Sequence, residues 1–491
     1  MTTVAPTGQT LSPTTPDELE RILASAHEAA GPFGRLLPSD RARVLDAIAD
    51  ALEADSEELV ALAAAETNLG TERLTGELKR TAFQMRLFGD VLRDGDFLDV
   101  RIDHEDLTWP SGVPRPDTRR TKIPVGPVLV FSASNFPFAF SVAGGDTASA
   151  LAAGNPVIVK AHSGHPQLSA RTADVVIQAC LSAGAPAGVF GLIHGTQAGS
   201  DALKDYRIKA AGFTGSIPGG RALMNIAMSR PDPIPFYGEL GSNNPVFVTP
   251  AAAEARGQSI AEGYVASFTM GAGQFCVKPG MLFVPTGSGM LEKLRNAALP
   301  AGARMLNDRI REGYVENLQR LSSHPNVDVL VQGLAPFSTS PSPILLATKS
   351  AHVLESPREL EAECFGPTSL VVEYDDLSQL VPLAETFEGQ LTATIHGEDD
   401  CPVQELVRVL SEKAGRVLWN QWPTGVAVTY AQHHGGPYPA STAAATTSVG
   451  TSAIDRFLRP VAYQGFPQHL LPVELQEENP LGVPQMINGR R

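Results

Sequence analysis

The sequence predicts an α/β protein made of two doubly wound α/β domains and a small arm. Short runs that are apolar at every position alternate with stretches of helical periodicity, first from about residue 125 and again after residue 243. Strands that are apolar on both faces and separated by helices are typical of parallel sheets covered on both sides. A chain of 491 residues is also too long for one simple core, so two large domains are expected.

The first hundred residues are expected to be helical. Ser39-Asp40 are predicted to cap one amphipathic helix, and Ser56 is predicted to start the next. The Pro- and Arg-rich segment 109–120 is expected to be an extended connection or an edge strand. The Pro-, Gln- and Leu-rich tail after Arg459 suits an arm that packs on a partner subunit better than it suits a core.

Apolar runs mark two successive sets of predicted strands, and helical stretches at 169–183 and 220–229 separate members of the first set. The predicted strands are 127–132, 156–160, 189–193 and 210–213 in the first set, and 244–248, 280–284, 369–373, 392–395 and 416–419 in the second. The predicted boundaries are residues 1–106 and 125–242 for the first domain, 243–452 for the second, and 107–124 with 453–491 for the arm.

The composition argues against several classes of partner. The formal net charge of −15 and the lack of a basic run argue against nucleic acid, whose phosphates require clustered Lys and Arg. No stretch reaches the roughly 18 apolar residues of a membrane span. The four cysteines are widely spaced, without a CxxC pair, so neither a metal site nor a disulfide framework is expected, and the cytoplasm is the expected compartment.

Cys276 is the strongest candidate for a catalytic nucleophile. It lies in the segment GAGQFCVKPG, residues 271–280, where glycines allow a substrate carbonyl to approach the sulfur. A cysteine in isolation is most often a small core residue, and the glycine-rich setting favours catalysis here. Upstream, Glu239 lies in a second glycine-flanked segment, an unusual place for a solvated glutamate. A thiol that attacks a carbonyl and a carboxylate that activates water together predict a two-step acyl-enzyme mechanism.

Two further segments predict an anion site at the ends of strands. The sequence FTGSIPGG, residues 213–220, follows an apolar strand and precedes a helix. Gly215 there allows a tight turn, and the helix start near Ile217 offers free N–H groups to a pyrophosphate. The segment lacks the GxGxxG spacing of the common dinucleotide fold, and Gly/Ser turns before helices are frequent. Lys160 lies at the end of another predicted strand. It is either a ligand of a ribose or phosphate group or a solvated lysine.

Five segments together resemble the aldehyde dehydrogenase superfamily. They stand in the family's order and approximate spacing, and the resemblance covers roughly residues 120 to 450. The segments are SNFP (134–137), FTGS (213–216), ELG (239–241), GQFC (273–276) and ECFGP (363–367). The resemblance implies NAD(P)-dependent oxidation of an aldehyde by a cofactor-binding domain followed by a catalytic domain.

The resemblance also implies roles for single residues. Cys276 is expected to form a thiohemiacetal and then a thioester, with the Asn135 amide and the Cys276 backbone N–H as the oxyanion hole. Glu239 is expected to activate the hydrolytic water, and its presence favours a free acid as product, because relatives that transfer the acyl group to coenzyme A or reduce acyl phosphates generally lack it. Cofactor contacts are implied for Lys160 at the adenosine ribose, for Gly215, Ser216 and Gly220 at the phosphates, and for Glu363 with Phe365 at the nicotinamide ribose.

Four further strings narrow the resemblance. Residues 140–154, 423–428, 434–439 and 456–460 are similar to the branch that holds 2,5-dioxopentanoate (α-ketoglutaric semialdehyde) dehydrogenases and an NADP-preferring fatty aldehyde dehydrogenase. The expected reaction is oxidation of 2,5-dioxopentanoate to 2-oxoglutarate. The alternatives are a fatty or aliphatic aldehyde, a non-catalytic member, and a cysteine hydrolase. A homodimer or homotetramer is also implied.

Arg80 is the candidate for binding the far end of the substrate. A dicarboxylate semialdehyde requires a cation for its far carboxylate, preferably a bidentate arginine. Arg80, in the predicted helix 74–92, stands where the superfamily's substrate tunnel is lined. The alternative is a surface arginine of that helix. Phe136 and Phe140 resemble apolar positions of the tunnel.

The cofactor is expected to be NADP, with NAD as the alternative. Many NAD-preferring relatives carry a glutamate three residues after the lysine, where this chain has Ser163. The serine removes charge repulsion against a 2′-phosphate, and His162 and His165 could assist. Gln197, in contrast, stands where NADP-preferring relatives carry an arginine, which favours NAD.

Overall fold

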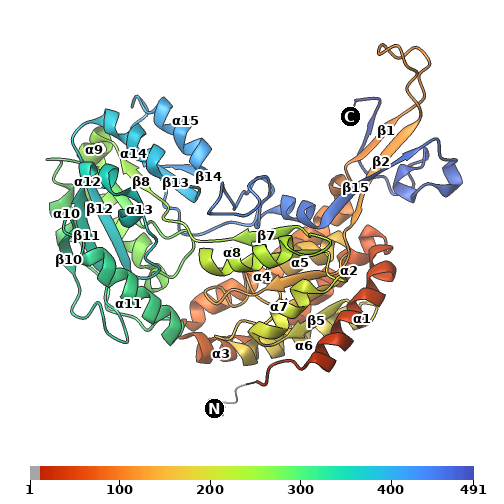
Figure 1. The fold of residues 1–491 in the computed structure, drawn as a ribbon, viewed down its shortest axis with the longest axis horizontal. Coiled ribbons are helices and arrows are strands. Elements are labelled where there is room, and N and C mark those ends of the chain that lie inside the picture. Colours follow the sequence, from red (N-terminus) through yellow and green to blue (C-terminus); the bar gives the residue numbers. More distant parts are fainter. Residues whose placement is uncertain (1–10, 491) are drawn as a thin grey trace.

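The computed structural model describes residues 11–490, so the extreme ends of the predicted segments 1–106 and 453–491 lie outside it. It confirms the predicted α/β class, with two mostly parallel sheets covered by helices and a third, smaller sheet (Figure 1). Within the described residues, no helix combines the length and the apolar character required to cross a membrane.

Four helices precede the first large sheet, as expected. They are α1 (Pro16–Gly34), α2 (Pro38–Ala54), α3 (Ser56–Thr67) and α4 (Thr71–Asp94). α1 begins with a capping box, in which the side chains of Thr15 and Glu18 each accept a hydrogen bond from the other's backbone N–H. The predicted Ser39-Asp40 cap of α2 is wrong, because the helix already starts at Pro38, whose fixed φ suits the first helical position.

The first large sheet has five parallel strands in the order β5-β4-β3-β6-β7. The chain places β4 and β5 on one side of β3 and then returns with β6 to the other side, so the crevice between β3 and β6 is a topological switch point, the usual ligand position in such sheets. The strands are β3 (Val128–Phe131), β4 (Val157–Lys160), β5 (Phe190–Ile193), β6 (Ala210–Thr214) and β7 (Phe236–Glu239). The helices are α5 (Gly145–Ala153), α6 (Pro166–Ser182), α7 (Thr196–Lys204) and α8 (Ile217–Met228).

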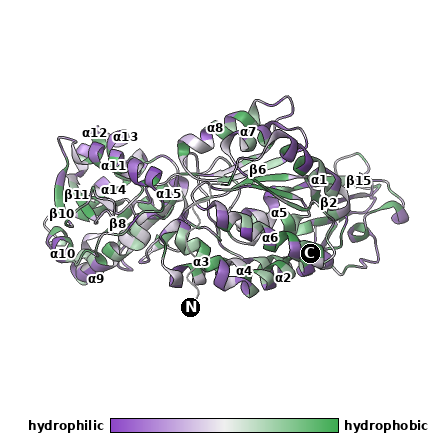
Figure 2. Ribbon diagram, turned by 90° about the horizontal axis from the view of Figure 1, so that it is seen from below, coloured by the Kyte–Doolittle hydropathy of each residue, from purple (hydrophilic) through white to green (hydrophobic). Residues whose placement is uncertain are grey.

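The second large sheet has seven strands in the order β10-β11-β12-β9-β8-β13-β14, parallel except for the β10–β11 pair. The strands are β8 (Val246–Val248), β9 (Met281–Pro285), β10 (Asp328–Gln332), β11 (Ile344–Lys349), β12 (Thr368–Tyr374), β13 (Gln390–His396) and β14 (Ala414–Trp419). The helices are α9 (Pro250–Thr269), α10 (Met290–Asn296), α11 (Asp308–Ser322), α12 (Ser350–Glu355), α13 (Pro357–Leu360), α14 (Leu380–Thr386) and α15 (Gln404–Lys413). In Figure 2 the strands around β6 carry mostly hydrophobic colours, whereas the outer helices of both lobes carry most of the hydrophilic ones.

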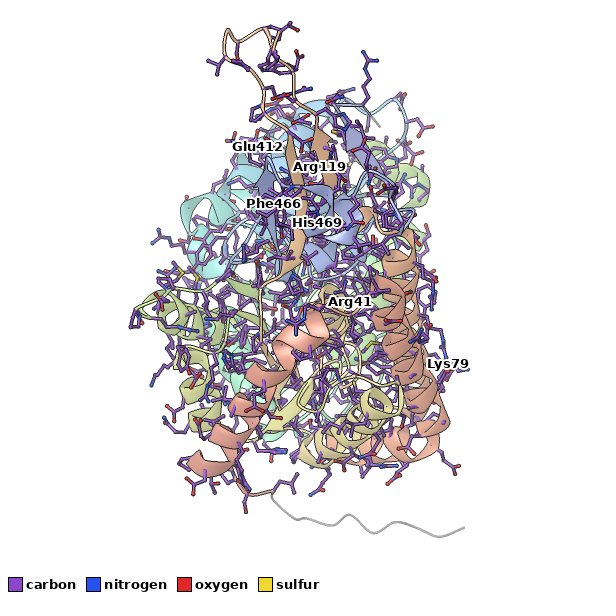
Figure 3. All side chains as sticks on the ribbon, turned by 90° about the vertical axis from the view of Figure 1, so that its right-hand side faces the viewer. Arg41, Lys79, Arg119, Glu412, Phe466 and His469 are labelled. Carbon is purple, nitrogen blue, oxygen red and sulfur yellow. The ribbon has the colours of Figure 1, made fainter. Side chains whose placement is uncertain are left out.

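The third sheet forms a projection at one end of the molecule (Figure 1). Its order is β15-β2-β1-β16, with β1 (Val100–Asp103), β2 (Thr118–Pro124), β15 (Leu458–Gln464) and β16 (Gln485–Ile487). Figure 3 shows Arg119, Phe466 and His469 together in this part. Of the two alternatives for residues 109–120, the edge strand is wrong, because β15 pairs with β2 from more than 300 residues further along the chain and leaves β2 inside the sheet. Residues 109–117 form a connection that precedes β2.

The strand ends determine where a site can form. In the first sheet, Lys160 ends β4, Glu239 ends β7 and Gly215 follows β6. In the second sheet, Cys276 and Glu363 each precede the amino end of a strand, β9 and β12 respectively. The site therefore lies where carboxyl ends of one parallel sheet meet segments that enter the other.

Candidate active site

Cys276 is held on a tight turn that requires glycine. Gly273 has a φ of +67°, and a Cβ there would overlap the carbonyl of Gly366. The turn is therefore packed directly against the segment that carries Glu363. Asn244 fixes the nucleophile from the other side, because its Nδ2 donates to the Cys276 carbonyl oxygen at 2.8 Å.

Glu239 points into the same space from the end of β7. Its side chain is only 3% exposed, and its backbone carbonyl accepts a hydrogen bond of 3.0 Å from the Gly215 N–H. Ser448 Oγ donates to Glu239 Oε2. The carboxylate is thus oriented by contacts on both its backbone and its side chain.

His434 lies between the thiol and the carboxylate. Its Nε2 is 3.6 Å from Cys276 Sγ and 2.7 Å from Glu239 Oε1, and its side chain is fully buried. The nearest polar atoms of the three side chains all lie within 4.8 Å of one another. A thiol, an imidazole and a carboxylate therefore share one cavity, as the acyl-enzyme mechanism requires.

The surroundings shift the pKa values of Cys276 and Glu239 in opposite directions. Burial raises the pKa of the Cys276 thiol well above its ordinary value, and the charges of Glu239 and Glu363 raise it further. Burial alone would also raise the pKa of Glu239, but contacts with His434 and Ser448 outweigh burial and hold the pKa below its ordinary value. In the resting protein, the thiol is therefore neutral and the carboxylate ionised.

Asn135 lies beside the nucleophile turn on the loop that follows β3. The Asn135 side-chain Nδ2 donates to the Gln274 backbone carbonyl at 3.1 Å. The Asn135 backbone carbonyl accepts a 2.6 Å hydrogen bond from Arg73 Nη2. Glu77 of α4 steadies the same loop by accepting hydrogen bonds from the backbone N–H groups of residues 138 and 139. A substrate oxyanion at Cys276 would compete with the Gln274 carbonyl for the Asn135 amide.

The predicted cofactor residues lie along the same edge of the first sheet. Ser216 caps α8, and its side chain accepts from the Gly219 N–H at 3.3 Å. Gly220 lies where α8 packs on the chain after β7, and a Cβ there would overlap the end of the Leu240 side chain. Lys160 is half-buried at the end of β4, whereas Ser163 is exposed on the loop beyond it.

Glu363 reaches this edge from the segment that precedes β12 of the second large sheet, and Phe365 lies two residues further along that segment. The Glu363 carboxylate lies against the backbone of Gly241, where a Cβ would overlap it. Burial raises the pKa of Glu363 to about 7, although Lys278 opposes the shift. A helix N-terminus, a lysine cation and a half-buried carboxyl group along this edge fit a dinucleotide.

The three predicted substrate residues form a chain of contacts that ends beside the nucleophile turn. The Phe136 ring lies 5.4 Å from that of Phe140 and 5.1 Å from that of Phe275, next to Cys276. Arg80 Nε and Nη2 donate to the Val426 carbonyl at 3.4 and 3.3 Å. Its guanidinium group lies 5.7 Å from the Phe140 ring centroid, so Arg80 points inward rather than to solvent.

Sequence reasoning missed two side chains of the site. His434 belongs to the string 434–439, which marked the branch but was given no chemical role. Ser448 carried no signal, because a serine far from Cys276 in sequence has no spacing that links it to Glu239. Both come from one loop between β14 and β15, which folds back over the thiol and the carboxylate.

The chain is similar to known proteins along nearly its whole length. Residues 6–459 match the Aldehyde dehydrogenase family. The chain is 44% identical over 494 residues to an alpha-ketoglutaric semialdehyde dehydrogenase of Acinetobacter baylyi, covering 99% of this chain and 93% of the relative. It is 45% identical over 482 residues to alpha-ketoglutaric semialdehyde dehydrogenase 2 of Azospirillum brasilense, covering 96% and 91%.

Solved structures agree with these matches at the level of the fold. A 1-pyrroline-5-carboxylate dehydrogenase from Thermus with bound NAD has a TM-score of 0.76 at 20% identity, covering 91% of this chain and 85% of that one. The strand ends, the glycine turns and the long sequence matches lead to one assignment. This chain belongs to the aldehyde dehydrogenase family and is an NAD(P)-dependent oxidoreductase that acts on aldehydes.

Proposed function

We propose that this chain oxidises 2,5-dioxopentanoate (α-ketoglutaric semialdehyde) to 2-oxoglutarate through a thioester on Cys276. The observation that carries the mechanism is the grouping of thiol, imidazole and carboxylate within 4.8 Å. The substrate is supported by the names of the two relatives at 44% and 45% identity and by the inward-facing guanidinium of Arg80.

In the first half-reaction, Cys276 attacks the aldehyde. His434 Nε2 accepts the thiol proton, and Sγ forms a bond to the carbonyl carbon. The carbonyl oxygen becomes an oxyanion that accepts hydrogen bonds from Asn135 Nδ2 and the Cys276 backbone N–H. NAD(P), when bound, supplies the acceptor for the hydride that leaves this carbon, and a thioester remains on Cys276.

In the second half-reaction, Glu239 activates water. Its pKa, held below the ordinary value, keeps the carboxylate ionised and able to accept a proton at neutral pH. The water oxygen bonds to the thioester carbon, the C–S bond breaks, and the thiolate recovers its proton from His434. The proton on Glu239 and that of the new carboxylic acid pass to solvent.

The cofactor that we propose is NADP. Ser163 brings no negative charge to the loop after β4, where the adenosine ribose is expected. Lys160 and His162 both interact electrostatically with Arg309 of α11. The N-cap of α11, Asn307, packs against Gly164 in the same loop. Lys160 and Arg309 are the cations that favour a 2′-phosphate, whereas burial lowers the pKa of His162 to about 3, so His162 is neutral and adds no charge. Gln197 hydrogen-bonds to Asp201 of its own helix and does not contribute.

We further propose a homodimer or homotetramer in the cytoplasm. Support for the assembly comes from β15, which lies at the edge of the projecting sheet and has exposed side chains along its length. The reducing compartment is suggested by four free cysteines, one of them the nucleophile. Light scattering of the purified chain after gel filtration tests the assembly, and a monomer would contradict it.

A panel of aldehydes assayed with NAD and NADP separately tests the proposed function. We expect the highest kcat/KM for 2,5-dioxopentanoate with NADP. A fatty aldehyde is the second candidate, favoured by the adjoining rings of Phe136, Phe140 and Phe275. A higher kcat/KM for long alkyl aldehydes than for the semialdehyde would replace the proposed substrate with this alternative.

A further inference from the structure

We propose that Arg416 joins Arg80 in a two-sided clamp for the carboxylate of the aldehyde substrate. The inference rests on the proposed function and extends it to a residue of β14 that carried no signal in the sequence. The two arginines come from different domains, Arg80 from α4 and Arg416 from the second large sheet.

The two guanidinium groups hold the same short segment. Arg80 donates to the carbonyl of Val426. Arg416 donates to the carbonyl of Gly425 at 3.2 Å and to that of Pro423 at 2.7 Å. The Val426 side chain packs in one small apolar cluster with Cys276. The segment 423–426 therefore carries both cations beside the nucleophile.

The sheet register places Arg416 on the face that carries the nucleophile. Arg416 pairs with Thr392 of β13, and paired residues of neighbouring strands project from the same face. Thr392 Oγ1 donates to Asn244 Oδ1 at 3.0 Å, and Asn244 holds the carbonyl of Cys276. In addition, a Cβ on Gly415 would overlap the carbonyl of Gly435, so the start of β14 abuts the loop of His434.

Neither guanidinium group forms an ion pair with any described carboxylate, although Glu77 and Glu239 lie near enough to Arg80 to interact electrostatically with it. Among the described residues, no Asp or Glu oxygen lies within 4.0 Å of either guanidinium group, and their hydrogen bonds go only to neutral carbonyls. Arg80 Nη1 and Arg416 Nε are buried and without a hydrogen-bond partner. Burial lowers the pKa of both arginines; the charges of Glu77, Cys276 and Glu239 oppose this shift at Arg80, and that of Cys276 opposes it at Arg416.

A half-buried cation that forms no ion pair is partly desolvated without compensation, and an anionic ligand offsets that cost. The guanidinium fork matches a carboxylate, and each group has a free N–H to offer. An aldehyde with a carboxylate at its far end satisfies both the nucleophile and the cations. An alkyl aldehyde leaves the two arginines unpaired, so the clamp selects anionic aldehydes over neutral ones.

The test compares two substrates of equal chain length, 2,5-dioxopentanoate and pentanal. In Arg416→Gln and Arg80→Gln, we expect the ratio of kcat/KM for the acid to that for pentanal to fall by about 10- to 100-fold, the equivalent of one charge-assisted hydrogen-bonded pair. The fall should appear in KM for the acid, and Arg416→Lys should recover part of it. Lys79→Gln and Arg408→Gln are matched controls, because both side chains are exposed (Lys79 in Figure 3).

If the arginines only support the 423–426 segment, kcat/KM should fall equally for both substrates, and that result would overturn the clamp. A readout without turnover guards against misfolded variants: calorimetric binding of 2-oxoglutarate should weaken in both variants while their unfolding temperatures stay near that of the parent. Unchanged 2-oxoglutarate binding also contradicts the clamp. The proposed function fails separately if the unsubstituted protein prefers pentanal to the acid.

Discussion

His434 provides the most informative perturbation of the active site, because it touches both the thiol and the carboxylate. Its Nε2 lies 3.6 Å from Cys276 Sγ and 2.7 Å from Glu239 Oε1. In His434→Gln, the amide fills part of the space but cannot accept the thiol proton. A positioned general base contributes about 10²- to 10⁴-fold to rate, so we expect acylation to slow by roughly 10²- to 10³-fold.

The same substitution acts on Glu239. His434 is among the groups that hold the pKa of this carboxyl below its ordinary value. Without the imidazole, burial dominates and the pKa of Glu239 rises. A carboxylate with a higher pKa becomes protonated at higher pH, so the acidic limb of the kcat profile should move to higher pH in the variant.

Two measurements follow these effects, with His433→Gln as the neighbouring control. The first is the pre-steady-state burst of reduced cofactor, which reports acylation. The second is the alkylation rate of Cys276 by iodoacetamide across a pH range. A His434→Gln burst as fast as that of the control, with an unchanged acidic limb, would refute the proton-transfer role of His434.

Further predictions concern the cofactor, the turn and metal ions. Because the pKa of Glu363 is about 7, KM for the cofactor should rise as pH falls through neutrality, and Glu363→Gln should remove this dependence. Arg309→Ala should raise KM for NADP while KM for NAD stays unchanged. Gly273→Ala, with its φ of +67° and the overlap with Gly366, should destabilise the protein by roughly 2–4 kcal/mol in urea unfolding. Zn²⁺ should inhibit aldehyde oxidation, and a chelator should reverse the inhibition, because the thiol, imidazole and carboxylate are suitable zinc ligands within 4.8 Å of one another. The inhibition should be weaker in His434→Gln.

The fold was largely predictable because apolar runs report buried parallel strands. The first four strands of the five-stranded sheet match the predicted runs to within a few residues. β10 and β11 were both missed although each contains a short apolar run, because a run of three or four apolar residues does not by itself distinguish a strand from a buried helix segment. β7 was missed because its apolar residues, Phe236 and Tyr237, are followed at once by Gly238 and Glu239.

The site residues that lie in local motifs were predictable. Those contributed by segments distant in the sequence were not. Cys276 and Glu239 can be recognised from the glycines that neighbour them in the sequence. His434 and Ser448 reach them through a loop that is close only in space, and Arg416 depends on strand register. No local pattern encodes such contacts, so the proton network and the clamp emerge only from the folded chain.

Mass spectrometry of the acyl-enzyme tests the central claim most directly. When Glu239→Gln is mixed with 2,5-dioxopentanoate and NADP and quenched, we expect a 2-oxoglutaryl thioester to accumulate on the peptide that contains Cys276, while the unsubstituted protein retains little. The absence of an adduct during cofactor reduction, or an adduct on Cys180, Cys364 or Cys401 instead, would contradict the account.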